Sequence, residues 1–175
     1  MKTLYVNWYG PYTSEDIEGG NQCSDDKPNL SGEGLYWIIG KPPRARRLHY
    51  YIGKTTNTYT IRFYNHQKLK YLERDRKIYL GKVVHPMQYQ YQNIDIAESM
   101  YIYFSQGGCI ASENERKTQK AIETDCVIVS QFFKEDGTTY ERLPKWLRIV
   151  PQFMLWDAEQ KTLYYATKLD IYKDE

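Results

Sequence analysis

Five side chains have the chemical types needed to hydrolyse a phosphate ester: Tyr36, Tyr51, Arg62, His66 and Glu98. Arg62 offers a planar cation that suits phosphate oxygens. Glu98 stands among apolar neighbours in the sequence, and a carboxylate in such surroundings needs a partner or a metal ion. Oxygen ligands of this kind suit Mg²⁺. The set therefore indicates phosphodiester hydrolysis with one divalent metal.

Two of these residues belong to a predicted β-hairpin. The apolar segments 34–40 and 48–53 flank the Pro-containing, basic connection KPPRARR at 41–47, which is typical of two paired strands. Tyr36 and Tyr51 would then converge on one face of the sheet if the register allows it. Gly53 lacks a side chain where the second strand ends, which predicts close approach of a ligand to the backbone.

Arg62 and His66 fall in a segment with a helical period. A helix from about 57 to 72, capped by Asn57 or a neighbouring Thr, would place them one turn apart and facing the same way. Its apolar face would hold Ile61, Tyr64, Leu69 and Leu72. A strand at 77–85 follows, and a helix at 94–106, capped by Asn93 and stopped by two glycines, carries Glu98.

The remaining segments complete an α+β domain. Residues 4–12 predict a short strand or extended arm, and 13–33 predict a loop. A weak helical pattern covers 113–122, a strand covers 125–133, and an Asp-Gly turn follows. Segments 151–156 and 162–172 predict a closing β-hairpin. We therefore expect a basic β-β-α-β-α part followed by a β-rich C-terminal addition.

Positive charge is concentrated in one third of the chain. Residues 34–92 hold twelve basic and two acidic residues, whereas 1–33 hold two and six, and 93–175 hold ten and fourteen. A surface that faces nucleic-acid phosphates has this distribution. The alternative is a basic stretch that acidic neighbours neutralise in the folded protein, and charge alone leaves both interpretations open.

The motifs GLY (34–36) and YIG (51–53), Arg62 with His66, Glu98 and Asn114 resemble the GIY-YIG nuclease superfamily in order and local spacing. The resemblance covers roughly residues 34–116. It implies a three-stranded antiparallel sheet flanked by helices, with a nuclease core at 34–122, an N-terminal arm and loop at 1–33, and a β-rich extension at 123–175. The gap at 37–50 is a few residues longer than is usual in the family.

The resemblance assigns Tyr36 to orient or deprotonate the attacking water. A free tyrosine has a pKa of about 10, so nearby cations would have to lower it, and Lys54 and Arg62 are the candidates. Tyr51 would hydrogen-bond near the scissile phosphate. Arg62 would stabilise the charge of the transition state.

The same resemblance assigns Glu98 to hold Mg²⁺ or Mn²⁺. His66 would assist proton transfer or position the nucleophile, and Asn114, Gly53 and Lys54 would support the site. The basic residues proposed to contact the DNA backbone are Arg44, Arg46, Arg47, Lys68, Lys70, Arg74, Arg76 and Lys77.

The sequence thus predicts a Mg²⁺-dependent DNA endonuclease, of a stand-alone or restriction type, in which a homodimer would cut both strands. One alternative is a catalytically silent nucleic-acid-binding module that keeps the fold. Another is a structural domain in which the tyrosines are core residues and Arg62 and His66 lie on a solvated helix face.

Composition also predicts the cellular compartment. No run of about 18 apolar residues predicts a transmembrane helix, and the N-terminus lacks the apolar region of a signal peptide. Cys23, Cys109 and Cys126 are scattered, without the spacing of a metal site. We therefore expect a reduced, cytoplasmic protein.

Overall fold

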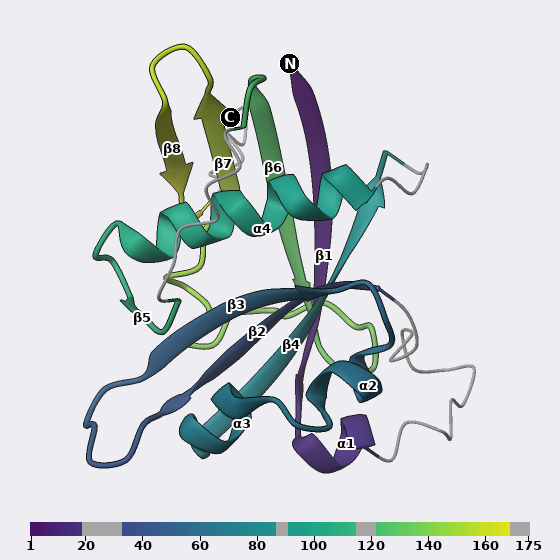
Figure 1. Cartoon of the computed structure of the whole chain (residues 1–175), viewed down its shortest axis with the longest axis vertical. Coiled ribbons are helices and arrows are strands. Elements are labelled where there is room, and N and C mark those ends of the chain that lie inside the picture. Colours follow the sequence, from purple (N-terminus) through teal and green to yellow (C-terminus); the bar gives the residue numbers. More distant parts are fainter. Residues whose placement is uncertain (19–32, 87–90, 115–121, 169–175) are drawn as a thin grey trace.

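A single mixed sheet dominates the computed structural model, which describes residues 1–18, 33–86, 91–114 and 122–168 of the chain (Figure 1). Its strand order is β5-β3-β2-β4-β1-β6-β7-β8, with β1 parallel to β6, β3 parallel to β5, and the other neighbours antiparallel. The strands are β1 (Lys2–Tyr12), β2 (Gly34–Lys41), β3 (His49–Thr55), β4 (Arg74–His85), β5 (Ala111–Ser112), β6 (Cys126–Phe133), β7 (Phe153–Asp157) and β8 (Thr162–Ala166).

The prediction of a three-stranded antiparallel sheet flanked by helices is wrong, because the structure has one curled eight-stranded sheet and is mostly β. β2, β3 and β4 are antiparallel neighbours, but β4 spans 12 residues and its second half pairs with β1. Residues 4–12, predicted to form a short strand or an extended arm, belong to β1, which is an internal strand of the sheet. Leu4, Val6 and Trp8 on alternate positions of β1 are fully buried, which ties it to the core by the two-residue strand period.

Helices cover both faces of the sheet. α4 (Tyr91–Gln106) crosses one face of the sheet. In the lower part of Figure 1, near β2 and β4, lie three short helices: α1 (Ser14–Glu18), α2 (Tyr59–Phe63) and α3 (Gln67–Tyr71). Trp37 packs in the cluster with α4, and the adjacent Tyr36 packs in the cluster with α2 and α3. β2 is consequently buried on both faces along nearly all of its length.

The predicted hairpin forms with a register that places both tyrosines on one face. Tyr36 pairs with Gly53 and Ile38 pairs with Tyr51, so the two tyrosines are diagonal neighbours. Their ring centroids lie 6.2 Å apart.

The single helix predicted for 57–72 is wrong, since α2 and α3 are separate. Thr58 caps α2, its side chain accepting from the Ile61 N–H, and His66 caps α3 through its own ring. The predicted apolar face also fails, because Ile61 and Tyr64 are 64% and 79% exposed. The break turns His66 off the axis of α2, so Arg62 and His66 do not lie one turn apart.

Other elements differ in detail from the expectation. α1 begins within the segment predicted to be a loop, and Asn93 lies inside α4, which starts at Tyr91. The strand, Asp-Gly turn and closing hairpin of the C-terminal part are present as β6, the turn at 134–137, β7 and β8. Cys23, most of the predicted loop and positions 115–121 of the weak helical pattern lie outside the described residues.

No helix within the described ranges is both long enough and apolar enough to cross a bilayer.

Tyr59 links α2 to two strands, and this gives a test of the fold. Its buried hydroxyl lies 3.1 Å from the Leu35 carbonyl oxygen and 3.0 Å from that of Gly81. We expect Tyr59→Phe to lower the free energy of unfolding by about 1–2 kcal/mol, because a buried hydrogen bond is lost. Urea denaturation measures this, with Tyr64→Phe, whose side chain is exposed, as a control expected to be neutral. Equal stability of the two variants would contradict the described contact.

Candidate active site

The Tyr36 hydroxyl is the point at which two predicted site residues meet. Arg62 Nε donates a hydrogen bond to Tyr36 Oη over 2.9 Å, and His66 Nε2 lies 2.9 Å from the same oxygen. The ring of Tyr36 is fully buried. The break between α2 and α3 therefore does not separate Arg62 from His66, because both reach one phenolic oxygen.

His66 acts here as a neutral hydrogen-bond donor. Its Nδ1 accepts from the Lys68 backbone N–H at 3.2 Å, so this nitrogen carries no proton. Burial, together with the charges of Arg62 and Lys68, lowers the pKa of His66 to about 4. At neutral pH the one ring proton is thus on Nε2, which donates to Tyr36.

Arg62 lowers the pKa of Tyr36, as expected of a nearby cation, but the net shift is upward. Burial raises this pKa well above its ordinary value, the neighbouring Tyr51 adds to the rise, and the opposing effect of Arg62 does not outweigh them. Because Tyr36 stays protonated at neutral pH, its hydroxyl can position groups but does not serve as a resting-state base.

The structure requires glycine at position 53 for a physical reason different from the predicted approach of a ligand. A Cβ at this position would overlap the Tyr36 ring and hydroxyl, since the two residues are directly opposite across the β2–β3 pair. The glycine is needed to seat Tyr36, and its bare backbone is explained without a ligand.

An open cleft of about 820 Å³ lies beside this cluster, at the edge of β3. Tyr51, Arg62, His66, Glu98 and Asn114 all line it, so the structure brings five predicted site residues to one cavity. They come from β3, α2, the α2–α3 junction, α4 and the segment after β5. Tyr36, Gly53 and Lys54 are not among its lining residues.

Asn114 closes part of the strand edge. Its Oδ1 accepts from the Ile52 N–H at 3.0 Å and its Nδ2 donates to the Ile52 carbonyl at 2.8 Å. These two hydrogen bonds imitate the pairing with a further strand at the residue just before Gly53. Asn114 therefore fixes the wall of the cleft.

Glu98 projects into the cleft from the buried face of α4. Burial raises the pKa of Glu98, against the opposing effect of Lys54, whose Nζ lies 3.3 Å from Oε2. Lys54 also forms an ion pair with Asp95. Lys54 is therefore engaged by two carboxylates of α4.

One carboxylate of the cleft, that of Glu98, could contribute to holding a Mg²⁺. No group of three potential metal-binding side chains of His, Cys, Asp or Glu occurs in the described part of the chain. Glu98 is nevertheless a carboxylate that faces a polar cleft, and Mg²⁺ is commonly held by one or two carboxylates with waters and substrate phosphates completing its shell. Lys54 competes for the same carboxylate, so tight binding without substrate is not expected.

One charged residue of the cleft wall, Glu113, is missing from the sequence prediction. Glu113 Oε1 lies 2.7 Å from His49 Nδ1, and Lys68 Nζ donates to Glu113 Oε2 at 3.3 Å. Glu113 thus links β3 to α3 across the cleft. Its position next to Asn114 was the available signal, but its partners are 64 and 45 residues away in the sequence.

The eight predicted DNA contacts do not share one surface. Lys68 lines the cleft, while Arg44, Arg46 and Arg47 are exposed in the β2–β3 connection, and Lys70 and Arg74 are exposed nearby. Arg76 donates to the Leu69 carbonyl at 2.6 Å. Lys77 follows it in β4 and so faces the opposite side of the sheet.

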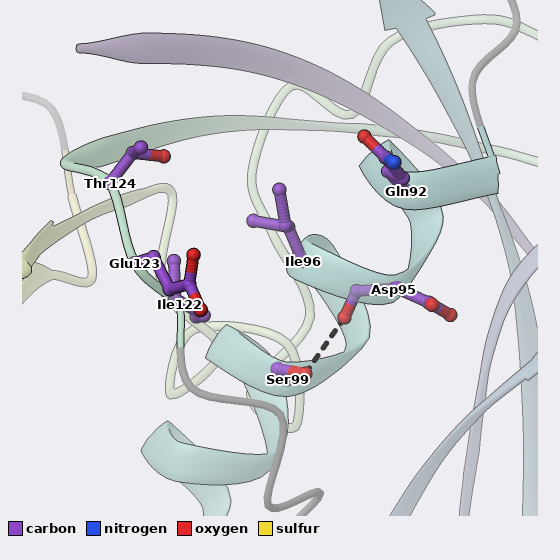
Figure 2. Close-up of a pocket in the computed structure, with 7 residues that line it drawn as sticks. All are labelled: Gln92, Asp95, Ile96, Ser99, Ile122, Glu123 and Thr124. Atoms are coloured by element: carbon purple, nitrogen blue, oxygen red, sulfur yellow. Dashed lines mark hydrogen bonds between the residues drawn. The ribbon is translucent and has the colours of Figure 1, made fainter.

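A smaller hollow of about 300 Å³ lies against the other side of α4. Figure 2 shows that the Asp95 carboxylate points away from Glu123 and Thr124, and that the Ser99 hydroxyl donates to the Asp95 backbone carbonyl. Its polar groups do not converge on a common point, so it is not a candidate site.

No protein-family model, curated protein or solved structure matches the chain. The resemblance to the GIY-YIG nuclease superfamily therefore remains a prediction that rests on the residues and their arrangement.

The lowered pKa of His66 makes stability depend on pH. An unfolded histidine takes up a proton near pH 6.5, whereas folded His66 does so near pH 4. The contribution of neutral His66 to the free energy of unfolding is fully present above pH 6.5. It is lost as the pH falls from 6.5 towards 4, because the unfolded state binds the proton first. We expect the free energy of unfolding of the wild type to fall more over this window than that of His66→Asn.

Asparagine keeps an oxygen that can cap α3, so this variant removes the titration and preserves the cap. Urea denaturation at several pH values measures the difference, with the exposed His85→Asn as a matched control that should follow the wild type. Parallel pH profiles for wild type and His66→Asn would show that folding does not lower the pKa of His66.

Proposed function

We propose that the protein hydrolyses phosphodiester bonds of DNA in a Mg²⁺-dependent reaction at the cleft beside β3. The observation that carries the proposal is the fixed orientation of Arg62. Its Nε is bound to Tyr36 Oη, and neither Nη has a hydrogen-bond partner among the described residues. The two Nη groups are therefore available to form bidentate hydrogen bonds with a phosphate.

Arg62 would stabilise the negative charge that builds up on phosphorus-bound oxygens during the attack of water. Such preorganised cations act most strongly where the geometry is set before the reaction. The Tyr36 hydroxyl would provide this preorganisation, because it is hydrogen-bonded to both Arg62 and His66. Tyr36 is thus proposed to position the guanidinium and not to accept the proton of the attacking water.

Glu98 would hold the Mg²⁺, which supplies polarisation of the scissile phosphate and neutralises the leaving oxygen. Tyr51 lines the cleft and packs at 5.4 Å between ring centroids against His66. Its hydroxyl is proposed to hydrogen-bond the phosphate or the attacking water. Asn114 and Glu113 would keep the cleft wall in place during the reaction.

DNA is the proposed substrate because basic side chains occur both in the cleft and on the neighbouring hairpin. Lys68 lines the cleft, and the exposed basic residues of the β2–β3 connection lie on the neighbouring hairpin. Association with a polyanion is strengthened by such a surface and weakens with salt. One cleft per chain cuts one strand at a time, so two chains or two events are proposed for a double-strand break.

A silent nucleic-acid-binding module is the second candidate, and two observations favour it. Tyr36 is fully buried, so it does not contact a substrate in this arrangement. Lys54 occupies one oxygen of Glu98, which weakens the proposed metal site. Both features are compatible with binding of DNA without cleavage.

The two candidates differ in a plasmid-cleavage assay with Mg²⁺. We expect the wild type to nick or linearise supercoiled DNA, and Arg62→Ala and Glu98→Gln to reduce the rate by about 100-fold or more, the usual cost of losing a transition-state contact. Both substitutions lie at the cleft, and circular dichroism would check that the variants are folded.

Matched controls are Arg142→Ala and Glu159→Gln, which change exposed residues that do not line the cleft. These should cut as the wild type does. DNA binding without cleavage by any of the proteins, on plasmid or branched DNA, would support the silent module. Equal cleavage by all five proteins would overturn the assignment of the site.

A further inference from the structure

A second hollow, of about 510 Å³, lies on the other face of the β2–β3 hairpin. Tyr50 lines this hollow and Tyr51 lines the cleft, and successive residues of a strand point to opposite faces. The hairpin therefore separates the two cavities. Lys41, Arg46, Lys77 and Lys145 line the hollow together with Trp146, and Asp75 is its one acidic lining residue among those described.

Positive charge in the hollow exceeds what its carboxylate can neutralise. Lys41 Nζ pairs with Asp75 at 2.6 Å. Arg46, Lys77 and Lys145 have no carboxylate within ion-pair distance in the described part of the chain. Three cations that converge on one open hollow repel each other, and an anionic ligand would relieve that repulsion.

Trp146 fixes the C-terminal side of the hollow to the sheet. Its Nε1 donates to Tyr79 Oη at 3.1 Å, and its backbone carbonyl accepts from Tyr50 Oη at 3.0 Å. Lys77 Nζ lies 4.6 Å from the centre of the Trp146 ring, a distance at which the ring attracts the cation. These contacts hold Lys145, the adjacent residue, beside the end of the hairpin where its two strands are connected.

We propose that this hollow is a second phosphate-binding site for duplex DNA, in which Arg46, Lys77 and Lys145 contact the backbone away from the cleft. The proposal rests on the proposed function. DNA held at both cavities would lie across the hairpin, whose exposed Arg44 and Arg47 project from the connection between its strands. It assigns a role to the segment around Lys145 and Trp146, which the catalytic cluster does not use.

The test is the salt dependence of DNA binding without metal. Binding of a fluorescein-labelled duplex of about three helical turns is measured in EDTA, at KCl concentrations from about 50 to 200 mM. For Arg46→Gln/Lys145→Gln we expect weaker binding and a logarithmic salt slope that is smaller by about 1.8, because each lost phosphate contact removes about 0.9. Both side chains are exposed, so folding should be unaffected.

The matched control is Lys134→Gln/Lys161→Gln, which removes the same two charges from exposed positions that line neither cavity. It should keep the wild-type slope. A slope for the hollow variant equal to that of the control would overturn the proposal, as would binding of an acidic protein ligand only, with no binding of DNA.

Cleavage separates this proposal from the proposed function. The control variant Lys134→Gln/Lys161→Gln should cut as fast as the wild type, because its changes lie outside both cavities. Binding that depends on the hollow in a protein that never cuts DNA would support the hollow and count against the nuclease. Mg²⁺-dependent cleavage with an unchanged salt slope would support the nuclease and reject the hollow.

Discussion

The buried hydroxyl of Tyr36 is the contact on which the candidate site depends. Two donors from different elements, Arg62 Nε and His66 Nε2, converge on this oxygen. Its lone pairs are thereby used inside the protein, where an unmet polar group would be costly. Arg62 also lines the cleft, and the hydrogen bond to Tyr36 orients its guanidinium there. A surface arginine without such a support would lose this preorganisation, since its side chain has many rotamers.

Several local features are needed to bury the Tyr36 ring and to satisfy the hydrogen bonds of its hydroxyl. Gly53 is required opposite the Tyr36 ring, where a methyl group would overlap it. The helix is broken between α2 and α3 so that His66 can cap α3 with Nδ1 while Nε2 faces Tyr36. Burial then keeps both groups in their neutral forms at neutral pH. The same environment that fixes the geometry therefore prevents Tyr36 from acting as a resting-state base.

Local patterns in the sequence were sufficient for part of this arrangement. The predicted hairpin forms, and its register places Tyr36 and Tyr51 on one face. Glu98, whose apolar neighbours predicted a partner or a metal ion, is paired with Lys54. Long-range effects were not visible. The parallel pairing of β1 with β6 joins residues more than 120 positions apart, so the eight-stranded sheet was missed. Ile61 gave a helical period although its side chain is exposed, and the pKa of Tyr36 depends on burial that only the folded chain creates.

Single-turnover cleavage of labelled duplex DNA by Tyr36→Phe, with Mg²⁺ and saturating enzyme, tests this account most directly. Loss of the hydroxyl frees Arg62 and His66, and a displacement of catalytic groups by about 1 Å can cost about 100-fold in rate. The account predicts a loss of that order with DNA binding retained. Tyr101→Phe, which removes another buried hydroxyl with two partners, should cut as the wild type does. Wild-type cleavage by Tyr36→Phe would contradict the central role given to this hydroxyl.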